Sequence, residues 1–328
     1  MQLAYLSYLS VALAAAAISA QEVHSGIKYE VRWAWDGPVE TAPIKDAYES
    51  AAAEQATARI VNAVNAAGAY TDCVPSPVDP SVAGVKALKH CIVAQNPKAF
   101  LTLLADAFPI ANAYWSNVIA RSTTDRAKFV PARVWVRGYY GAALTAVQFA
   151  TWTLSDDADA VDLDTNPEHY YKSTVVDALG VATSQIVEGW GGVLSPTIGT
   201  LVTNFTVPGY TVPVFDGGLT PGGYPTEWAL DPSFNILLQR IGPKVLPDGQ
   251  TFGYLHIAAR DVPANTKTGE PAAVEIYAGV WYPPYDGASA AEQAEFVDNW
   301  LADEAHHIVV EIINSGLAAM EQVGAGRR

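Results

Sequence analysis

The sequence predicts an α+β domain: a curved antiparallel sheet, or partial barrel, that is covered by helices. Three observations support this fold class. The N-terminal half is rich in segments with helical spacing, period-2 segments follow, and a long apolar stripe closes the chain. Helices followed by strands are typical of α+β proteins rather than of alternating βαβ units. No Ser/Gly-rich linker or repeat divides residues 21–328, so we expect a single globular domain there.

The first 20 residues have the features of a secretory signal peptide. An apolar run from Val11 to Ile18 is followed by the small residues Ser19 and Ala20. This run is too short to span a bilayer, and it ends in a small-residue cleavage site. We therefore predict a signal peptide at residues 1–20 and a secreted mature protein. The alternative interpretation is a buried N-terminal helix.

Two further features agree with export. Cys73 and Cys91 are the only cysteines, and two thiols this close in sequence are expected to pair in an oxidising compartment. Asn204-Phe205-Thr206 is a glycosylation sequon, which predicts a modified surface loop at Asn204.

The charge balance limits the possible partners. The chain has 19 Lys and Arg against 34 Asp and Glu, a net charge of −15 that is spread along its length. Such a surface repels phosphate backbones and anionic lipids, so we expect neither a nucleic acid nor a membrane as partner. Nothing in the sequence sets the oligomeric state.

The N-terminal half predicts one strand followed by helices. Alternating apolar and charged residues predict a strand at Ile27–Trp35, and helical spacing follows in three segments. These segments are Asp46–Ala67, the residues around Val82 to Ile92, and Lys98–Ala120. The last is expected to kink or break at Pro109, because proline removes a helical hydrogen bond.

The remainder predicts strands and a closing helix. We expect two strands and a bend in Ala132–Leu154, a helix at Thr174–Trp190, a short strand at Leu201–Phe205, and a long hairpin made of Phe252–Asp261 and Ala273–Tyr282. Ser289 and Glu292 form a capping-box pattern at the start of a final helix that runs to about Val323.

Three of these strands share one facial pattern. One side is aliphatic, and the other combines rings with Arg, His and Glu. Large rings with a few convergent polar groups are typical of a cavity for an apolar or aromatic small molecule. The predicted substrate-binding residues are Trp135, Tyr139, Tyr254, Arg260 and Trp281. The alternatives are an ordinary amphipathic sheet surface and an oligomer interface.

Four residues of the same face are candidates for catalysis. His256 titrates near neutrality when unperturbed, and Glu275 becomes a general acid if burial raises its pKa. Tyr277 can donate a proton or a hydrogen bond, and Arg137 can hold a developing oxyanion.

The predicted last helix contains one pattern that is typical of a metal site. Glu304 and His307 have the E-x-x-H spacing of carboxylate-bridged metal sites, but the chain lacks a second copy. Asp303, His307 and Glu311 are spaced as an exposed charge ladder on the last helix, which is the interpretation we adopt. We predict no metal site.

The acidic segment from Asp156 to Asn166 invites a calcium interpretation. Asp162, Asp164 and Asn166 match the first ligands of an EF-hand loop, but Pro167 stands where glycine is needed and Ser173 where glutamate is needed. A solvated hairpin tip is the preferred interpretation, with weak extracellular calcium binding as its alternative.

Several signatures are absent from the sequence. It contains no G-x-S-x-G, H-E-x-x-H or P-loop pattern, and no G-x-G-x-x-G that leads into a helix. We therefore expect chemistry without a cofactor, by cavity shape and proton transfer.

Four segments carry a resemblance to a known family: the leader, the Tyr29–Trp35 segment, Pro167-Glu168-His169-Tyr170-Tyr171, and the Phe252–Tyr285 hairpin with Trp281-Tyr282-Pro283-Pro284-Tyr285. The family is that of the secreted fungal hetero-Diels-Alderases of tropolone–sesquiterpene biosynthesis, and the resemblance covers most of the mature chain. It implies dehydration of a hydroxylated tropolone to an o-quinone methide, followed by cycloaddition to a cyclic sesquiterpene. No catalytic residue is carried over from the family.

Two other functions fit the same residues. The protein could be a secreted binding protein that carries an apolar small molecule. It could also be a glycan-active enzyme with paired carboxylates, namely Glu275 with Glu227 or Asp216.

Overall fold

The structure is a computed structural model that describes residues 23–24, 26–40, 46–179, 181–190, 194–195, 197–210 and 224–325. The signal peptide predicted at residues 1–20 lies outside the described residues, and so does Asp216. Export therefore stays a prediction. Within the described ranges, none of the helices is long and apolar enough to cross a membrane.

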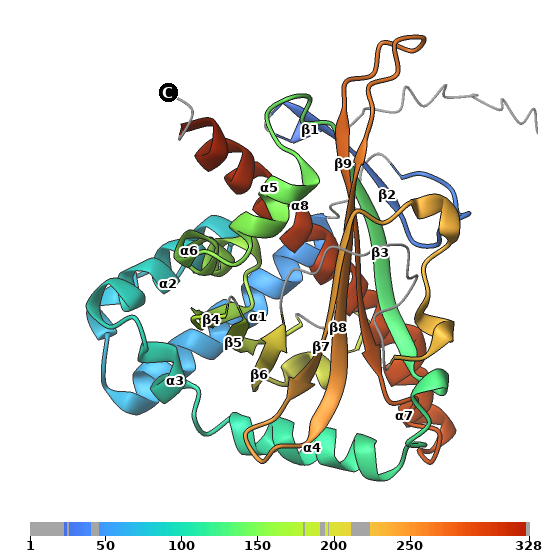
Figure 1. Ribbon diagram of the computed structural model, residues 1–328. Coiled ribbons are helices and arrows are strands. Elements are labelled where there is room, and N and C mark those ends of the chain that lie inside the picture. The colour runs from blue at the N-terminus through green and yellow to red at the C-terminus, as the bar shows by residue number, and fades with distance from the viewer. Residues whose placement is uncertain are drawn as a thin grey trace, which may run out of the picture.

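In the described part of the chain, nine strands form an antiparallel sheet in the order β1-β2-β3-β9-β8-β7-β6-β5-β4. β6 pairs with β7 only at Thr206 and Val245, and Figure 1 shows β4, β5 and β6 turned away from the long central strands. The predicted curved antiparallel sheet is confirmed. The strands are β1 Val23–His24, β2 Ile27–Arg32, β3 Val130–Gly138, β4 His169–Val176, β5 Ala182–Glu188, β6 Thr203–Tyr210, β7 Leu238–Val245, β8 Thr251–Val262 and β9 Ala273–Tyr282.

The helices gather beside the sheet, and most of the N-terminal half is helical, as predicted (Figure 1). Helix α3 ends at Leu103, and α4 begins at Phe108 with Pro109 in its first turn, where a missing N–H costs nothing. The first six helices are α1 Asp46–Ala67, α2 Val82–Gln95, α3 Ala99–Leu103, α4 Phe108–Ala120, α5 Ala146–Trp152 and α6 Asp156–Thr165.

The C-terminal helix begins as predicted. Ser289 accepts a hydrogen bond from the backbone N–H of Glu292, whose side chain returns the interaction. One continuous helical segment follows: α7 Ala290–Ala294, a π-helical turn at Glu295–Trp300, and α8 Leu301–Ala325. Apolar residues of α8, among them Val309 and Ile313, pack against the aliphatic side of β3 and β9 in the main core.

A second core holds the N-terminal helices against the outer strands. Ile60 of α1, Ile92 of α2 and Phe100 of α3 pack with Tyr170 of β4 and Val187 of β5. The predicted Cys73–Cys91 disulfide is present, with the two Cα atoms 5.5 Å apart. It ties α2 to the loop before it.

Three predicted elements differ in the structure. Thr174–Trp190 was expected to be a helix, but it completes β4 and forms β5, because the segment is rich in the β-branched residues Val, Thr and Ile, which favour strands. The acidic segment expected as a hairpin tip is α6, which is capped by Ser155 and has carboxylates near its positive end. The second strand expected before Leu154 is α5, which begins with a Thr145/Gln148 capping box.

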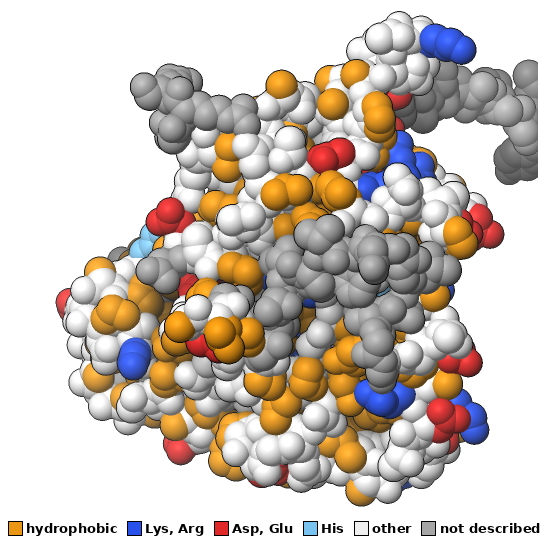
Figure 2. All heavy atoms as spheres, in the orientation of Figure 1, with side chains coloured by type: hydrophobic (Ala, Val, Ile, Leu, Met, Phe, Trp, Pro, Cys, Tyr) orange, Lys and Arg blue, Asp and Glu red, His pale blue; other side chains and the backbone are white. Residues whose placement is uncertain are grey.

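The glycosylation sequon lies in a strand rather than in the expected loop. Asn204 is part of β6, is partly buried, and its Oδ1 accepts a hydrogen bond from Gln185 Nε2 at 3.1 Å. Its modification stays a prediction. On the face seen in Figure 2, acidic side chains are dispersed rather than gathered into one patch.

Candidate active site

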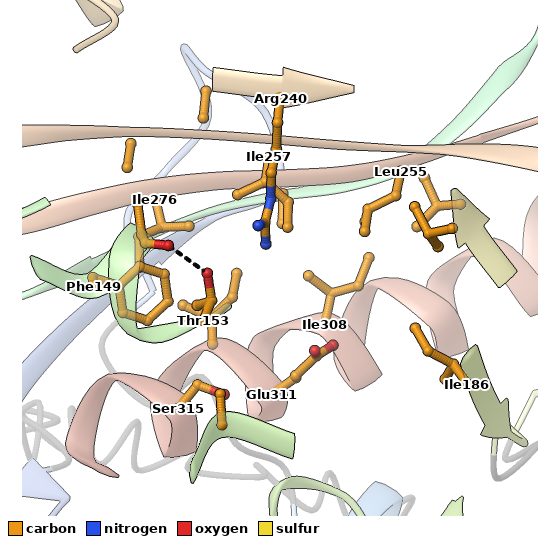
Figure 3. A pocket seen from close by; sticks show the side chains of 18 of the residues that line it. Phe149, Thr153, Ile186, Arg240, Leu255, Ile257, Ile276, Ile308, Glu311 and Ser315 are labelled. Atoms are coloured by element: carbon orange, nitrogen blue, oxygen red, sulfur yellow. Dashed lines mark hydrogen bonds between the residues drawn. The ribbon is translucent and has the colours of Figure 1, made fainter. Parts of the chain in front are cut away.

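A cavity of about 120 Å³ lies between the aliphatic face of the sheet and α8. Leu255, Ile257 and Ile276 form its apolar strand wall, and Ile308 of α8 and Phe149 of α5 face them (Figure 3). An engineered apolar cavity of roughly 150 Å³ is large enough to bind benzene. The volume described here therefore suits one small ring.

A polar stripe of α8 lines the same cavity. It consists of Glu304, His307, Glu311 and Ser315, whose spacings of three and four residues place them on one side of the helix. The expected exposed charge ladder is therefore wrong: Glu304 is 2% exposed and His307 7% exposed, because the sheet covers this side. Asp303 is also buried and accepts a hydrogen bond from Ser195 Oγ at 2.8 Å.

Glu304 is the best-placed proton donor of the cavity. Its Oε1 accepts a hydrogen bond from Tyr282 Oη at 2.8 Å, whereas Oε2 is buried and has no hydrogen-bond partner among the described residues. Burial raises the pKa of Glu304 to about 7, although Lys244, 3.9 Å away, acts in the opposite direction. The carboxyl group can therefore give or take a proton near neutral pH.

The neighbouring hydrogen bonds fix where that proton sits. Lys244 Nζ donates to Tyr282 Oη at 3.3 Å and to Glu188 Oε1 at 2.9 Å, which commits the Tyr282 hydrogen to Glu304 Oε1. Protonated Glu304 consequently carries its hydrogen on Oε2. Oε2 is the oxygen atom that has no hydrogen-bond partner among the described residues, and so the one available to a ligand.

A buried histidine pair adjoins this group. His169 Nε2 and His307 Nε2 are 2.6 Å apart, and His169 Nδ1 lies 3.0 Å from Asp162 Oδ2. Asn166 Nδ2 lies 2.7 Å from His307 Nδ1. Burial disfavours protonation of His169, but Asp162 outweighs it, and the pKa of His169 rises to about 9.

A buried lysine positions the segment that carries His169. Lys89 Nζ of α2 donates to the carbonyl oxygens of Leu163, Asn166 and His169 at 2.5, 2.9 and 2.9 Å. Burial lowers the pKa of Lys89 to about 7. Asp162, one of the residues proposed for calcium, instead pairs with His169 and with Lys172 at 3.2 Å.

His169, His307 and Glu188 bring three potential metal ligands within 4.8 Å of one another. Two nitrogens bound to one zinc ion at about 2.0–2.1 Å in tetrahedral geometry would be roughly 3.3 Å apart. The Nε2 atoms are closer, at hydrogen-bonding distance, and Lys244 already places a cation on Glu188. The arrangement fits a shared proton better than a metal ion.

The raised pKa of His169 predicts a pH-dependent stability. Its contribution is fully present below the unfolded value of 6.5 and is lost as pH rises through about 9. A shift of this size corresponds to a free energy on the order of 3 kcal/mol. In denaturant unfolding at pH 6 and pH 10, we expect the wild type to lose more stability than His169→Gln. The exposed-site variant His90→Gln is the control, and equal losses in wild type and His169→Gln would contradict the assignment.

The predicted aromatic face lies on the other side of the sheet from this cavity. Trp135, Tyr277 and Ala258 pack under the segment at residues 224–237, with Leu230 and Phe234. Trp281 stacks on Trp228, with ring centroids 4.9 Å apart. The predicted residues are thus brought onto one face, where they are buried or half-buried, but the cavity of the described chain adjoins the aliphatic face instead. Their catalytic and binding roles stay predictions.

His256 and Glu275 have structural partners on that face. His256 is fully buried, hydrogen-bonds Gln239 Oε1 at 3.1 Å, and has its pKa lowered by burial to about 3, so it does not titrate near neutrality as expected. Glu275 pairs with Arg32, Arg137 and Arg260 at 3.1, 3.0 and 2.5 Å.

The remaining predicted site residues are on the same side. Arg137 also contacts Glu30 at 3.5 Å, and Lys28 Nζ lies 4.5 Å above the Tyr139 ring. Tyr254 packs on Trp228, with centroids 5.3 Å apart. Glu227, proposed as the carboxylate partner of Glu275 in a glycan-active enzyme, is exposed in a 3-10 turn at Thr226–Trp228.

Comparison with solved structures finds distant matches, two of which are described here. No protein-family model matches the chain, and no curated protein matches it. A Staphylococcus aureus protein of unknown function is similar at 8% identity and TM-score 0.32, over 60% of this chain and 97% of the other. The ZhuI aromatase/cyclase from Streptomyces sp. R1128 is similar at 12% identity and TM-score 0.28, over 61% and 96%. Similarity at this level assigns no activity.

Proposed function

We propose that the protein is a cofactor-free dehydratase or cyclase that acts on an apolar ring compound in the cavity beneath α8. The observation that carries the proposal is the carboxyl group of Glu304. It is buried in the cavity wall, has its pKa raised to about 7, and has one oxygen atom without a hydrogen-bond partner among the described residues. A group of this kind can protonate a leaving hydroxyl, which bulk water at neutral pH does poorly.

The proposed step is a balanced loss of water. Glu304 Oε2–H gives its proton to a hydroxyl group on a carbon attached to the ring, and the C–O bond breaks with its electron pair leaving on the new water molecule. A hydroxyl on the neighbouring ring carbon loses its proton, and its electrons form the carbonyl of a quinone methide. The released proton returns to a carboxylate of the wall, so that one water is the only by-product.

The specific form of this proposal follows the family resemblance. A hydroxylated tropolone would lose water to give the o-quinone methide, which would then add to a cyclic sesquiterpene. Holding two apolar partners in register can supply several kcal/mol of the barrier. A volume near 120 Å³ supports the binding of one ring more directly than the binding of both partners together.

The proposal is tested by incubating the purified protein with a hydroxymethyl tropolone and humulene and following the products by mass spectrometry. We expect both loss of the tropolone alcohol and formation of an adduct faster than in buffer. If the alcohol binds but is not converted, the protein is a binding protein and the enzymatic proposal is wrong. Conversion of a polysaccharide panel instead would support the glycan-active alternative.

A further inference from the structure

A further cationic group enters the cavity from strand β7. Residues of this strand line the cavity, among them Leu238, Arg240 and Lys244. Arg240 is 8% exposed, and Figure 3 shows its guanidinium group extending into the cavity while Glu311 faces it from α8. An arginine side chain keeps its charge at any pH at which the protein is folded.

Two lysines of the cavity are closely paired with carboxylates. Lys244 Nζ lies 2.9 Å from Glu188 Oε1, and Lys172 Nζ lies 3.2 Å from Asp162 Oδ1. Burial raises the pKa of Glu311, although His169 lowers it. The carboxyl groups of α8 can thus take up protons.

Arg240 stands at a distance from the proposed acid. Arg240 and Lys244 are four residues apart on one strand, a span of about 13 Å. Glu304 and Glu311 are seven residues apart on α8, a span of about 10 Å. Because Lys244 adjoins Glu304, Arg240 and the proposed acid lie toward different ends of the cavity lining.

We propose that Arg240 binds an acidic oxygen substituent of the substrate, a carboxylate or an enolate, and so selects compact apolar acids over neutral rings. The inference rests on the proposed function in that both use one cavity. A guanidinium group donates two parallel hydrogen bonds to such an oxygen pair, and these charge-assisted bonds are stronger than neutral ones. The aliphatic wall would hold the ring itself.

The test measures binding of benzoate and of its neutral isostere benzamide by calorimetry. We expect the wild type to bind benzoate at least 10-fold more tightly than benzamide. Arg240→Met should remove at least 10-fold of the benzoate affinity and leave benzamide binding unchanged. Arg133→Met is the matched control, because Arg133 is an exposed arginine on the opposite side of the sheet, and it should leave both affinities unchanged.

Arg240→Lys provides a second variant if Arg240→Met fails to fold. It keeps the charge but loses the paired donors, so we expect an intermediate benzoate affinity. Equal binding of benzoate and benzamide by the wild type, or an equal effect of Arg133→Met, would overturn the inference. Because binding is measured without turnover, its outcome does not depend on tropolone conversion: selective benzoate binding without conversion would support this inference and overturn the proposed reaction.

Discussion

Replacing Glu304 by Gln is expected to lower the turnover rate by roughly 10²–10⁴-fold, the usual contribution of a general acid. Glutamine has the same shape and can still accept the hydrogen bond from Tyr282, but it has no proton to transfer. The measurement is single-turnover conversion of the tropolone alcohol, together with KM. We expect the rate to fall while KM stays near its wild-type value, because the apolar wall is intact.

The pH profile gives an independent check on this assignment. Since the protonated form of Glu304 is the active one and its pKa is raised to about 7, activity should decrease as pH rises through that value. Glu321→Gln is the matched control, an exposed glutamate on the same helix whose substitution should leave the rate unchanged. A Glu304→Gln variant that retains the wild-type rate would rule out Glu304 as the acid.

Replacing Glu275 by Ala is expected to cost about 3–5 kcal/mol of stability, the range for breaking a buried ion pair. The Glu275 side chain is 1% exposed, and three arginines converge on it. Removing it leaves three guanidinium groups close together without their shared carboxylate. Denaturant unfolding at constant pH measures the loss.

Two further variants define the interpretation of that result. Glu227→Ala removes an exposed carboxylate of the same sheet side and should change stability by less than about 0.5 kcal/mol. Glu275→Gln keeps the volume and should lie between wild type and Glu275→Ala. A loss below about 1 kcal/mol for Glu275→Ala, well under the range for a broken buried pair, would mean that the ion-pair cluster is not a major source of stability.

Local sequence signals predicted the parts of the fold that depend on residues close together in the sequence. The Ser289/Glu292 capping box, the two strands of the long hairpin and the Cys73–Cys91 pair are confirmed. The helix expected at Thr174–Trp190 was wrong, because its β-branched residues favour strands and β5 pairs with both β4 and β6.

The location of the cavity could not be predicted in the same way. The alternation of residue types predicted that β8 and β9 each have an aliphatic and an aromatic side. It did not indicate which of the two sides another segment of the chain would cover. Residues 224–237 cover the aromatic side, and their packing partners are distant in sequence. Glu304 and His307 were missed because helical spacing of charged residues is the same on a buried and on an exposed side. A signal was available in the apolar residues that flank them, Ile308 and Ile312, which mark that side as partly buried.

The π-helical turn at Glu295–Trp300 determines which residues of the last helix the substrate would encounter. A π turn contains one residue more than the α-helical turn it replaces, and each residue advances an α-helix by about 100°. A chain with one residue deleted there would rotate every later side chain by about that angle, so that Glu304 and Glu311 would leave the lumen together. Deleting a single residue of this turn would thus reorient the whole acidic stripe of α8 without changing any residue in that stripe.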